Sequence, residues 1–182
     1  MPDSPVGNRA RRHPLSDLHA RRIETLERFI AANDEAGRQH DWTGLRPFYT
    51  EDADYHYDTG AVRTEAHGPD EIVNLVLVRD QLGWMNWTYP FESYAVNGDH
   101  AFTRWWNRGP GTRPDGSFYQ VIGMSYIRFA PESTLFAEQI DLFDLGVLVK
   151  LCDEIPDELL LPVMKEKQLP MMRKLVSDTL GS

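Results

Sequence analysis

The sequence has a single cysteine, Cys152, among 182 residues. One cysteine excludes an internal disulfide and any metal site built from several thiolates. The six histidines show no close ligand spacing, so no bound metal is expected. Apolar runs stay well short of the roughly 18 residues that a membrane-spanning helix needs, and no membrane partner is expected. The first residues lack the apolar stretch of a secretion signal, which favours a cytoplasmic location.

Positive charge is also scarce. The sequence has 19 Lys and Arg against 28 Asp and Glu, which gives a formal net charge of −9. A negative field repels phosphate backbones, so nucleic acid is not an expected partner. Phosphate-loop, dinucleotide-binding, nucleophile-elbow and zinc-protease motifs are absent as well. These absences leave no expected cofactor and favour chemistry carried by side chains alone.

The sequence does show an ordered change from helical to strand-like patterning. Apolar residues recur at helical spacing over residues 15–33, residues 52–58 favour a short strand, and Gly68 precedes a second helix. Four long strands are predicted after Gly83, at residues 84–96, 99–108, 117–130 and 134–143. Helix returns from residue 145. We therefore predict an α+β fold, a cone in which a strongly curved, mostly antiparallel sheet wraps around N-terminal helices, with extra C-terminal helices.

Three segments are predicted along the chain. Residues 1–14 form a flexible N-terminal arm, residues 15–152 form the cone-shaped domain, and residues 153–182 form a helical C-terminal extension. The extension is rich in Leu and Met, so it is apolar enough to pack. Three roles are open for it: covering the mouth of a pocket, extending a dimer interface, or packing against the core.

The last predicted strand combines acids with apolar side chains. Alternation places Asp141 on one face with Gln139 and Phe143, and it places Asp144 on the other face. A carboxyl group on a buried face has a raised pKa, which suits a general acid or base. The structural alternative for either face is an exposed acid, or an acid paired with an arginine.

The first predicted strand separates into two faces in the same way. Tyr55 and Tyr57 lie on one side, where they serve either as core residues or as orienting donors in a pocket. His56 and Asp58 lie on the other side, where an acid–base pair and a solvated face explain them equally well.

Three segments, residues 48–56, 68–72 and 139–146, carry a resemblance to a known family. Together they resemble the nuclear transport factor 2-like superfamily, in its SnoaL-like and limonene-epoxide-hydrolase branches, over roughly residues 20–150. The resemblance implies a cone-shaped α+β barrel with a deep pocket, often a homodimer. Enzymes of this superfamily include polyketide cyclases, ketosteroid isomerases, scytalone dehydratase and epoxide hydrolases, whereas other members only bind or scaffold.

The resemblance to the epoxide-hydrolase branch also assigns roles to residues. The catalytic acid on the last strand matches Asp141, and the two residues that hold the attacking water match Tyr55 and Tyr57. The remaining Arg and Asp of that branch fall on Trp105 and Asn107, so epoxide hydrolysis through a charged relay is not expected.

The ketosteroid-isomerase pattern is incomplete too. Its helix Tyr falls on Phe29, its oxyanion Asp on Ser125, and its base on Tyr57 or Asp58. The SnoaL-like branch is therefore the least contradicted, because a lone acid in an aromatic pocket can serve there.

These features predict a cofactor-independent enzyme that acts by general acid/base catalysis on a small apolar oxygenated molecule. The substrate is expected to be polyketide-, terpene- or steroid-like, and the reaction to be a cyclisation, dehydration or isomerisation, that is, lyase or isomerase chemistry. Asp141 is the predicted acid or base, and Tyr55, Tyr57 and Asn107 are predicted to orient the substrate. The residues predicted to contact the substrate are Trp105, Tyr119, Val121, Ser125, Gln139 and Phe143.

His56, Asp58 and Asp144 are secondary candidates for catalysis. The alternative function is a non-catalytic module of the same fold that binds a small ligand or forms a dimer.

Overall fold

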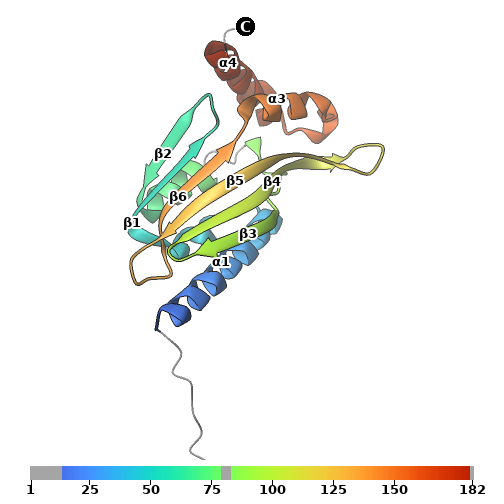
Figure 1. Cartoon of the computed structure of the whole chain (residues 1–182). Coiled ribbons are helices and arrows are strands. Elements are labelled where there is room, and N and C mark those ends of the chain that lie inside the picture. Colours follow the sequence, from blue (N-terminus) through green and yellow to red (C-terminus); the bar gives the residue numbers. More distant parts are fainter. Residues whose placement is uncertain (1–13, 79–82, 181–182) are drawn as a thin grey trace, which may run out of the picture.

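The computed structural model describes residues 14–78 and 83–180 of the chain (Figure 1). The first half contains α1 (Pro14–Gln39), the 3-10 helix η1 (Thr43–Phe48), β1 (Tyr49–Asp58), β2 (Arg63–His67), α2 (Gly68–Glu71) and the π-helical segment η2 (Ile72–Val78). Four strands follow, namely β3 (Phe91–Asn97), β4 (His100–Thr112), β5 (Phe118–Phe129) and β6 (Phe136–Phe143). The chain ends with α3 (Leu145–Glu154), the short helices η4 (Asp157–Leu159) and η5 (Met164–Gln168), and α4 (Leu169–Leu180).

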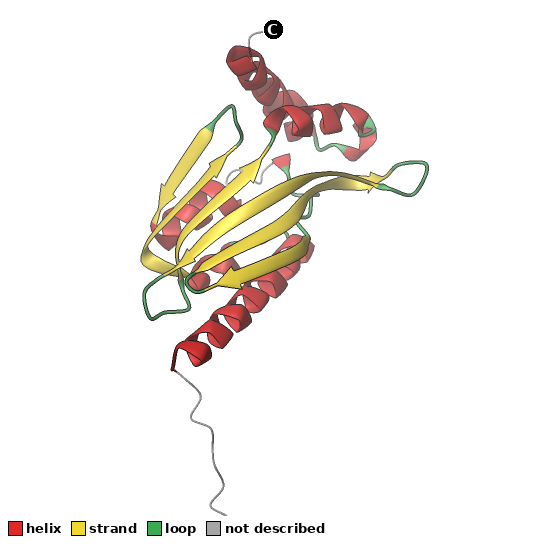
Figure 2. Cartoon of the chain, in the orientation of Figure 1, coloured by secondary structure: helices red, strands yellow, loops and turns green. Residues whose placement is uncertain are grey.

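The six strands form one curled sheet in the order β2-β1-β6-β5-β4-β3. Neighbouring strands are antiparallel except β1 and β6, which run parallel. Figure 2 shows α1 and the other early helices on one face of the sheet, and the C-terminal helices gathered at one end. This arrangement confirms the predicted α+β cone.

Aromatic side chains hold α1 against the sheet. The ring of Phe29 meets Phe48, Phe91 and Phe136 edge-on, with centroid distances of 5.3, 6.2 and 5.0 Å. Edge-to-face pairs of this kind stabilise a core beyond the area that they bury. A second buried cluster forms around α3 and the residues that follow it. The space between the two clusters is where the cavity lies.

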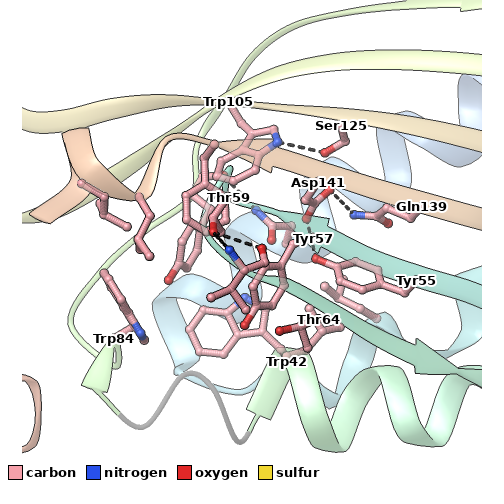
Figure 3. Close-up of a pocket in the computed structure, with 18 of the residues that line it drawn as sticks. Trp42, Tyr55, Tyr57, Thr59, Thr64, Trp84, Trp105, Ser125, Gln139 and Asp141 are labelled. Carbon is pink, nitrogen blue, oxygen red and sulfur yellow. Dashed lines mark hydrogen bonds between the residues drawn. The ribbon is translucent and has the colours of Figure 1, made fainter. Parts of the chain in front are cut away.

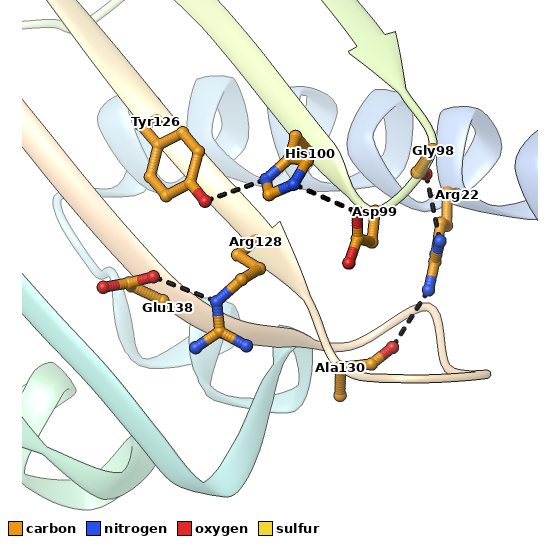
Figure 4. A network of polar contacts seen from close by, with 8 residues as sticks. All are labelled: Arg22, Gly98, Asp99, His100, Tyr126, Arg128, Ala130 and Glu138. Carbon is orange, nitrogen blue, oxygen red and sulfur yellow. Dashed lines mark hydrogen bonds and ion pairs between the residues drawn. The ribbon is translucent and has the colours of Figure 1, made fainter.

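Arg22, near the N-terminal end of α1, binds the turn between β3 and β4 and the turn between β5 and β6 (Figure 4). Its guanidinium donates to the backbone carbonyls of Gly98, Ala130 and Ser133 at 3.0, 3.0 and 2.9 Å. The group also lies 5.3 Å from the centroid of the Phe129 ring. Arg22 is therefore a buried cation whose donors are satisfied by backbone carbonyl oxygens of the two turns.

The strand predicted at residues 84–96 is shorter in the structure and begins only at Phe91. Before it, the chain turns so that the rings of Trp84 and Trp87 meet at 4.8 Å, and only an isolated bridge joins Thr88 to Arg108. The aromatic content that indicated a strand here instead serves packing within a turn. Strand β2 was not predicted, because its sequence is mostly polar and only Ala66 in it is buried.

Two further expectations concern the ends of the chain and the membrane. The arm predicted at residues 1–14 lies outside the described residues, apart from Pro14, which belongs to α1. Within residues 14–78 and 83–180, no helix is long and apolar enough to cross a membrane.

Candidate functional site

A cavity of about 450 Å³ opens between the inner face of the sheet, α1 and the C-terminal helices. Its wall is mostly aromatic and aliphatic, with polar side chains at a few points (Figure 3). A pocket of this size and character is typical of a site for a small organic molecule. The polar groups that interrupt the apolar wall therefore indicate which end of a ligand is polar.

Asp141 on β6 points into the cavity and accepts hydrogen bonds from three side chains. The Tyr55 hydroxyl donates to Oδ2 at 2.5 Å and Gln139 Nε2 donates to Oδ1 at 3.0 Å (Figure 3). The Ser125 hydroxyl is the third donor. The sheet register explains the cluster, because Asp141 pairs with Ser125 on β5 and with Tyr57 on β1. The carboxylate therefore sits at the centre of three adjacent strands.

Two more donors orient the groups that contact the acid. The Tyr49 hydroxyl donates to Gln139 Oε1 at 2.8 Å, which leaves the Gln139 amide nitrogen facing the carboxylate. Trp105 Nε1 donates to Ser125 Oγ at 2.9 Å. Since a hydroxyl has one proton to give, the Ser125 proton stays available for the acid. The network thus presents donors, and no competing acceptor, to the carboxylate.

Gly123 makes room for the ring of Trp105. The two residues are paired across β4 and β5, and a Cβ atom on Gly123 would lie 2.5 Å from the indole. Only glycine lets the flat ring lie against the neighbouring strand and direct its N–H toward Ser125.

Burial raises the pKa of Asp141 above its usual value, although the three hydrogen bonds and the charge of His56 act in the opposite direction. The same burial, together with the charge of Asp141, holds the pKa of Tyr49 and of Tyr55 well above the usual range. Both phenols therefore keep their protons at neutral pH and act as donors. The site combines an acid that is costly to ionise with a phenol, that of Tyr55, which stabilises its ionised form.

The donors that contact Asp141 are all neutral side chains. Among the described residues that line the cavity there is no Lys, Arg or His, so the arginine-paired alternative does not hold for this acid. The described part of the chain also contains no group of three or more side chains placed to ligate a metal ion.

Most of the predicted site residues come together at this cavity. Those that line it are Tyr55, Tyr57, Trp105, Ser125, Gln139, Asp141 and Phe143. The ring of Tyr57 lies tilted against that of Phe143 with centroids 6.0 Å apart, so these two form one side of the pocket next to the acid.

Asn107, Tyr119 and Val121 were predicted to face the pocket but lie outside its lining. Strands β4 and β5 continue beyond the cavity, and their far half packs against the cluster around α3 that contains Tyr119 and Val121. Asn107 pairs with Val121 there and is 3% exposed, and its Nδ2 has no partner within the described residues. Alternation along a strand fixes the face of a residue but not how far along that face the cavity extends.

The three secondary candidates for catalysis lie outside the lining of the cavity. Asp144 caps α3, with Oδ1 accepting from the Val147 amide at 2.9 Å. Asp58 accepts from the Gly60 amide at 2.9 Å in the turn between β1 and β2. His56 is half-buried beside Ile140 and, like the other two, is not part of the cavity lining.

Sequence reasoning missed several lining residues. Tyr49 shares the parity of Tyr55 and could have been found by alternation, but the predicted strand began three residues after it. Thr64 lies on the unpredicted strand β2. The C-terminal lining residues are Gln168, Met171, Met172 and Leu175, and their apolar pattern gave no indication of which cavity they would reach.

Comparison with known proteins gives one family match. A family model described as SnoaL-like domain matches residues 26–135. A search of curated proteins found no match.

Solved structures provide several matches to the fold. A SnoaL-like polyketide cyclase candidate from Jannaschia sp. CCS1 has a TM-score of 0.57 at 20% identity, over 80% of this chain and 98% of that one. An NTF2-like protein of unknown function from Burkholderia pseudomallei has a TM-score of 0.54 at 16% identity, over 71% and 95% of the two chains. TerC, co-crystallised with polyporic acid, has a TM-score of 0.54 at 13% identity, over 72% and 98%. At these identities the likeness concerns the fold.

Proposed function

Because the chain belongs to the SnoaL-like domain family, we propose that it is a cofactor-independent enzyme of that fold. It acts by general acid/base catalysis on a small apolar oxygenated molecule of polyketide, terpene or steroid type. The reaction is a cyclisation, dehydration or isomerisation carried out with Asp141 as the proton-transfer group. The observation that carries this proposal is a buried carboxylate that lines an apolar cavity and is contacted by neutral donors.

The place of Asp141 in the cavity lining defines the first step. A substrate carbon next to a carbonyl gives its proton to Asp141, and the electron pair of the broken C–H bond moves toward the carbonyl oxygen to form an enolate. A raised pKa makes Asp141 a stronger base than an exposed aspartate, and its hydrogen bonds favour the ionised form that accepts the proton. The apolar wall keeps bulk water from competing for the proton.

The second step returns the proton. In a cyclisation, the enolate carbon attacks a second carbonyl carbon, and the resulting alkoxide takes the proton from Asp141. In an isomerisation, the proton returns to a different carbon, and in a dehydration it goes to the departing hydroxyl group. Tyr57, paired with Asp141 across β1 and β6, lines the cavity and orients the substrate for these transfers.

The test compares two Asp→Asn variants on the same sheet. The probe is 2-tetralone, whose activated C–H protons exchange slowly with deuterium in D2O and are followed by NMR. Wild-type protein should accelerate the exchange, and Asp141→Asn should reduce the acceleration by about 10²- to 10⁴-fold, the usual contribution of a general base. Asp58→Asn is the control, because Asp58 lies in a turn outside the cavity lining.

Equal exchange rates with wild type and Asp141→Asn would refute the catalytic role of Asp141. Binding of the probe without any acceleration would favour the alternative, a non-catalytic ligand-binding module. That alternative is supported by the uncharged residues, Trp105 and Asn107, at the two positions where the epoxide-hydrolase pattern has its Arg and Asp.

We also propose that the protein forms a homodimer through the outer face of the sheet. Four adjacent apolar side chains on this face are 43–50% exposed, namely Phe102, Ile122, Met124 and Leu142. A two-fold axis through the interface buries this patch against its own copy. Light scattering should give a dimer for wild type and a monomer for Met124→Glu, and a monomeric wild type would refute the proposal.

A further inference from the structure

The C-terminal extension lines the end of the cavity away from Asp141. Four of its side chains line the cavity, namely Gln168, Met171, Met172 and Leu175. Their spacing of three, four and seven residues places them on one face of a helix. Met172 is buried, whereas Met171 lines the cavity and is still 51% exposed, so it stands at the mouth.

Three glycines of the cone-shaped domain lie directly against side chains of the extension. A Cβ atom on Gly109 would lie 2.6 Å from Ile155, one on Gly111 would lie 2.6 Å from Leu159, and one on Gly83 would lie 2.6 Å from Gln168. Ile155, Leu159 and Gln168 therefore each occupy the space that a side chain at the facing glycine would need. These three glycine sockets fix the path of the extension from residue 155 to residue 168.

Polar contacts strengthen the attachment near the sockets. Arg113 on the β4–β5 hairpin pairs with Glu154 at 2.6 Å. The Asn86 side chain donates to the Leu159 carbonyl at 2.8 Å. Arg173 of α4 pairs with Asp153 at the end of α3. With three sockets and these contacts, the extension is a built part of the cavity wall, unlike a lid that swings away to admit a ligand.

The geometry of the cavity gives this wall a function. In Figure 3, Trp84 lies on the opposite side of the labelled residues from Asp141 and Gln139, and its neighbour Gly83 is the socket for Gln168. A ligand with its polar end at Asp141 therefore extends its apolar end toward the extension. The flexible thioether of Met171 stands where that end would leave the cavity.

We propose that the extension sets the maximum ligand length that the cavity accepts, with Met171 and Leu175 as specificity-determining residues. This inference rests on the proposed function in one respect, because it takes Asp141 as the anchor for the polar end. It adds a limit on the length of the ligand's apolar end, and this limit does not depend on whether Asp141 transfers a proton.

The experiment uses 4-alkylphenols, from ethyl to nonyl, as probes. The phenol group can donate to Asp141, and binding is followed through the fluorescence of Trp42, Trp84 and Trp105, which line the cavity. With the wild-type protein, each additional buried methylene should tighten binding by about fourfold until the chain reaches the wall. Beyond that length the affinity should stop rising or fall.

Two substitutions at Met171 change the length of the cavity in opposite directions. Met171→Ala should shift the best chain length to longer alkylphenols, and Met171→Trp should shift it to shorter ones. The matched controls are Val147→Ala and Val147→Trp, because Val147 lies on α3, is 45% exposed and does not line the cavity. They should leave the best chain length unchanged.

The outcomes separate this inference from the proposed function. If alkylphenols bind and the Met171 variants leave the best chain length unchanged, the proposed length limit is refuted, while the proposed role of Asp141 is unaffected. If no alkylphenol binds to wild type, the proposed ligand class fails, and quenching of tryptophan fluorescence by acrylamide decides the question of the wall. Quenching should then rise with Met171→Ala and fall with Met171→Phe, which adds bulk without adding a tryptophan, and equal quenching in the two variants would refute the inference.

Discussion

The hydrogen bond from Tyr55 to Asp141 provides a direct test of the electrostatics of the cavity. Tyr55→Phe keeps a ring that is 4% exposed and removes only the hydroxyl, which donates at 2.5 Å. A hydrogen bond to a charged group contributes about 1.5–3 kcal/mol, so the free energy of unfolding should fall by that amount once the pH is high enough to ionise Asp141. The matched control is Tyr94→Phe, because the Tyr94 hydroxyl also donates to a carboxylate, that of Glu27, at 2.5 Å but on the surface. Its effect should stay within about 0.5 kcal/mol.

The loss caused by Tyr55→Phe should also depend on pH in a defined direction. Burial raises the pKa of folded Asp141, so its contribution to stability is present below the unfolded pKa, near 3.8, and is lost as the pH rises through the folded pKa. Removing one donor raises the folded pKa further. The deficit of the variant should therefore be smallest below pH 3.8, grow as the pH rises through the raised pKa, and stay constant above it. Urea unfolding at a series of pH values measures this, and a deficit that is the same at every pH would refute the assignment.

Three further predictions concern packing and reactivity. Gly123→Ala should lower the free energy of unfolding by about 1–3 kcal/mol, because the new methyl group overlaps the Trp105 ring, whereas Gly44→Ala, with no heavy atom within 4 Å, should not; urea unfolding checks both. Arg22→Lys should cost at least about 3 kcal/mol in the same assay, because one ammonium group cannot serve three separate carbonyls. Burial raises the pKa of Cys152 to about 12, so Ellman's reagent should react with it only after unfolding, and rapid labelling of the native protein would contradict its burial.

The part of the site that alternation determines could be predicted from the sequence. A strand has a period of two, so Gln139, Asp141 and Phe143 had to share one face, and so did Tyr55 and Tyr57. The order of helices and strands was sufficient for the α+β class. The structure adds that the faces of β1 and β6 are the same inner face, which depends on pairing between distant strands.

The extent of the cavity could not be predicted. Asn107 has the correct parity, but the distance along β4 at which the wall of α3 begins depends on packing between residues far apart in the sequence. The same is true of the glycine sockets, because Gly83, Gly109 and Gly111 resemble ordinary turn or strand glycines until the extension is placed against them. The division of the chain at residue 152 stays a prediction.

The parallel contact between β1 and β6 has a consequence for how the protein is made. Tyr55 and Asp141 are separated by 86 positions in the sequence, and β6 must insert between β1 and β5 before they can meet. During translation, Tyr55 is therefore synthesised long before Asp141. Every nascent fragment that ends before residue 136 lacks β6, the strand between β1 and β5. Long-range pairing of this kind slows folding. The hydrogen-bonded cluster around Asp141 therefore forms late, when β6 closes the centre of the sheet.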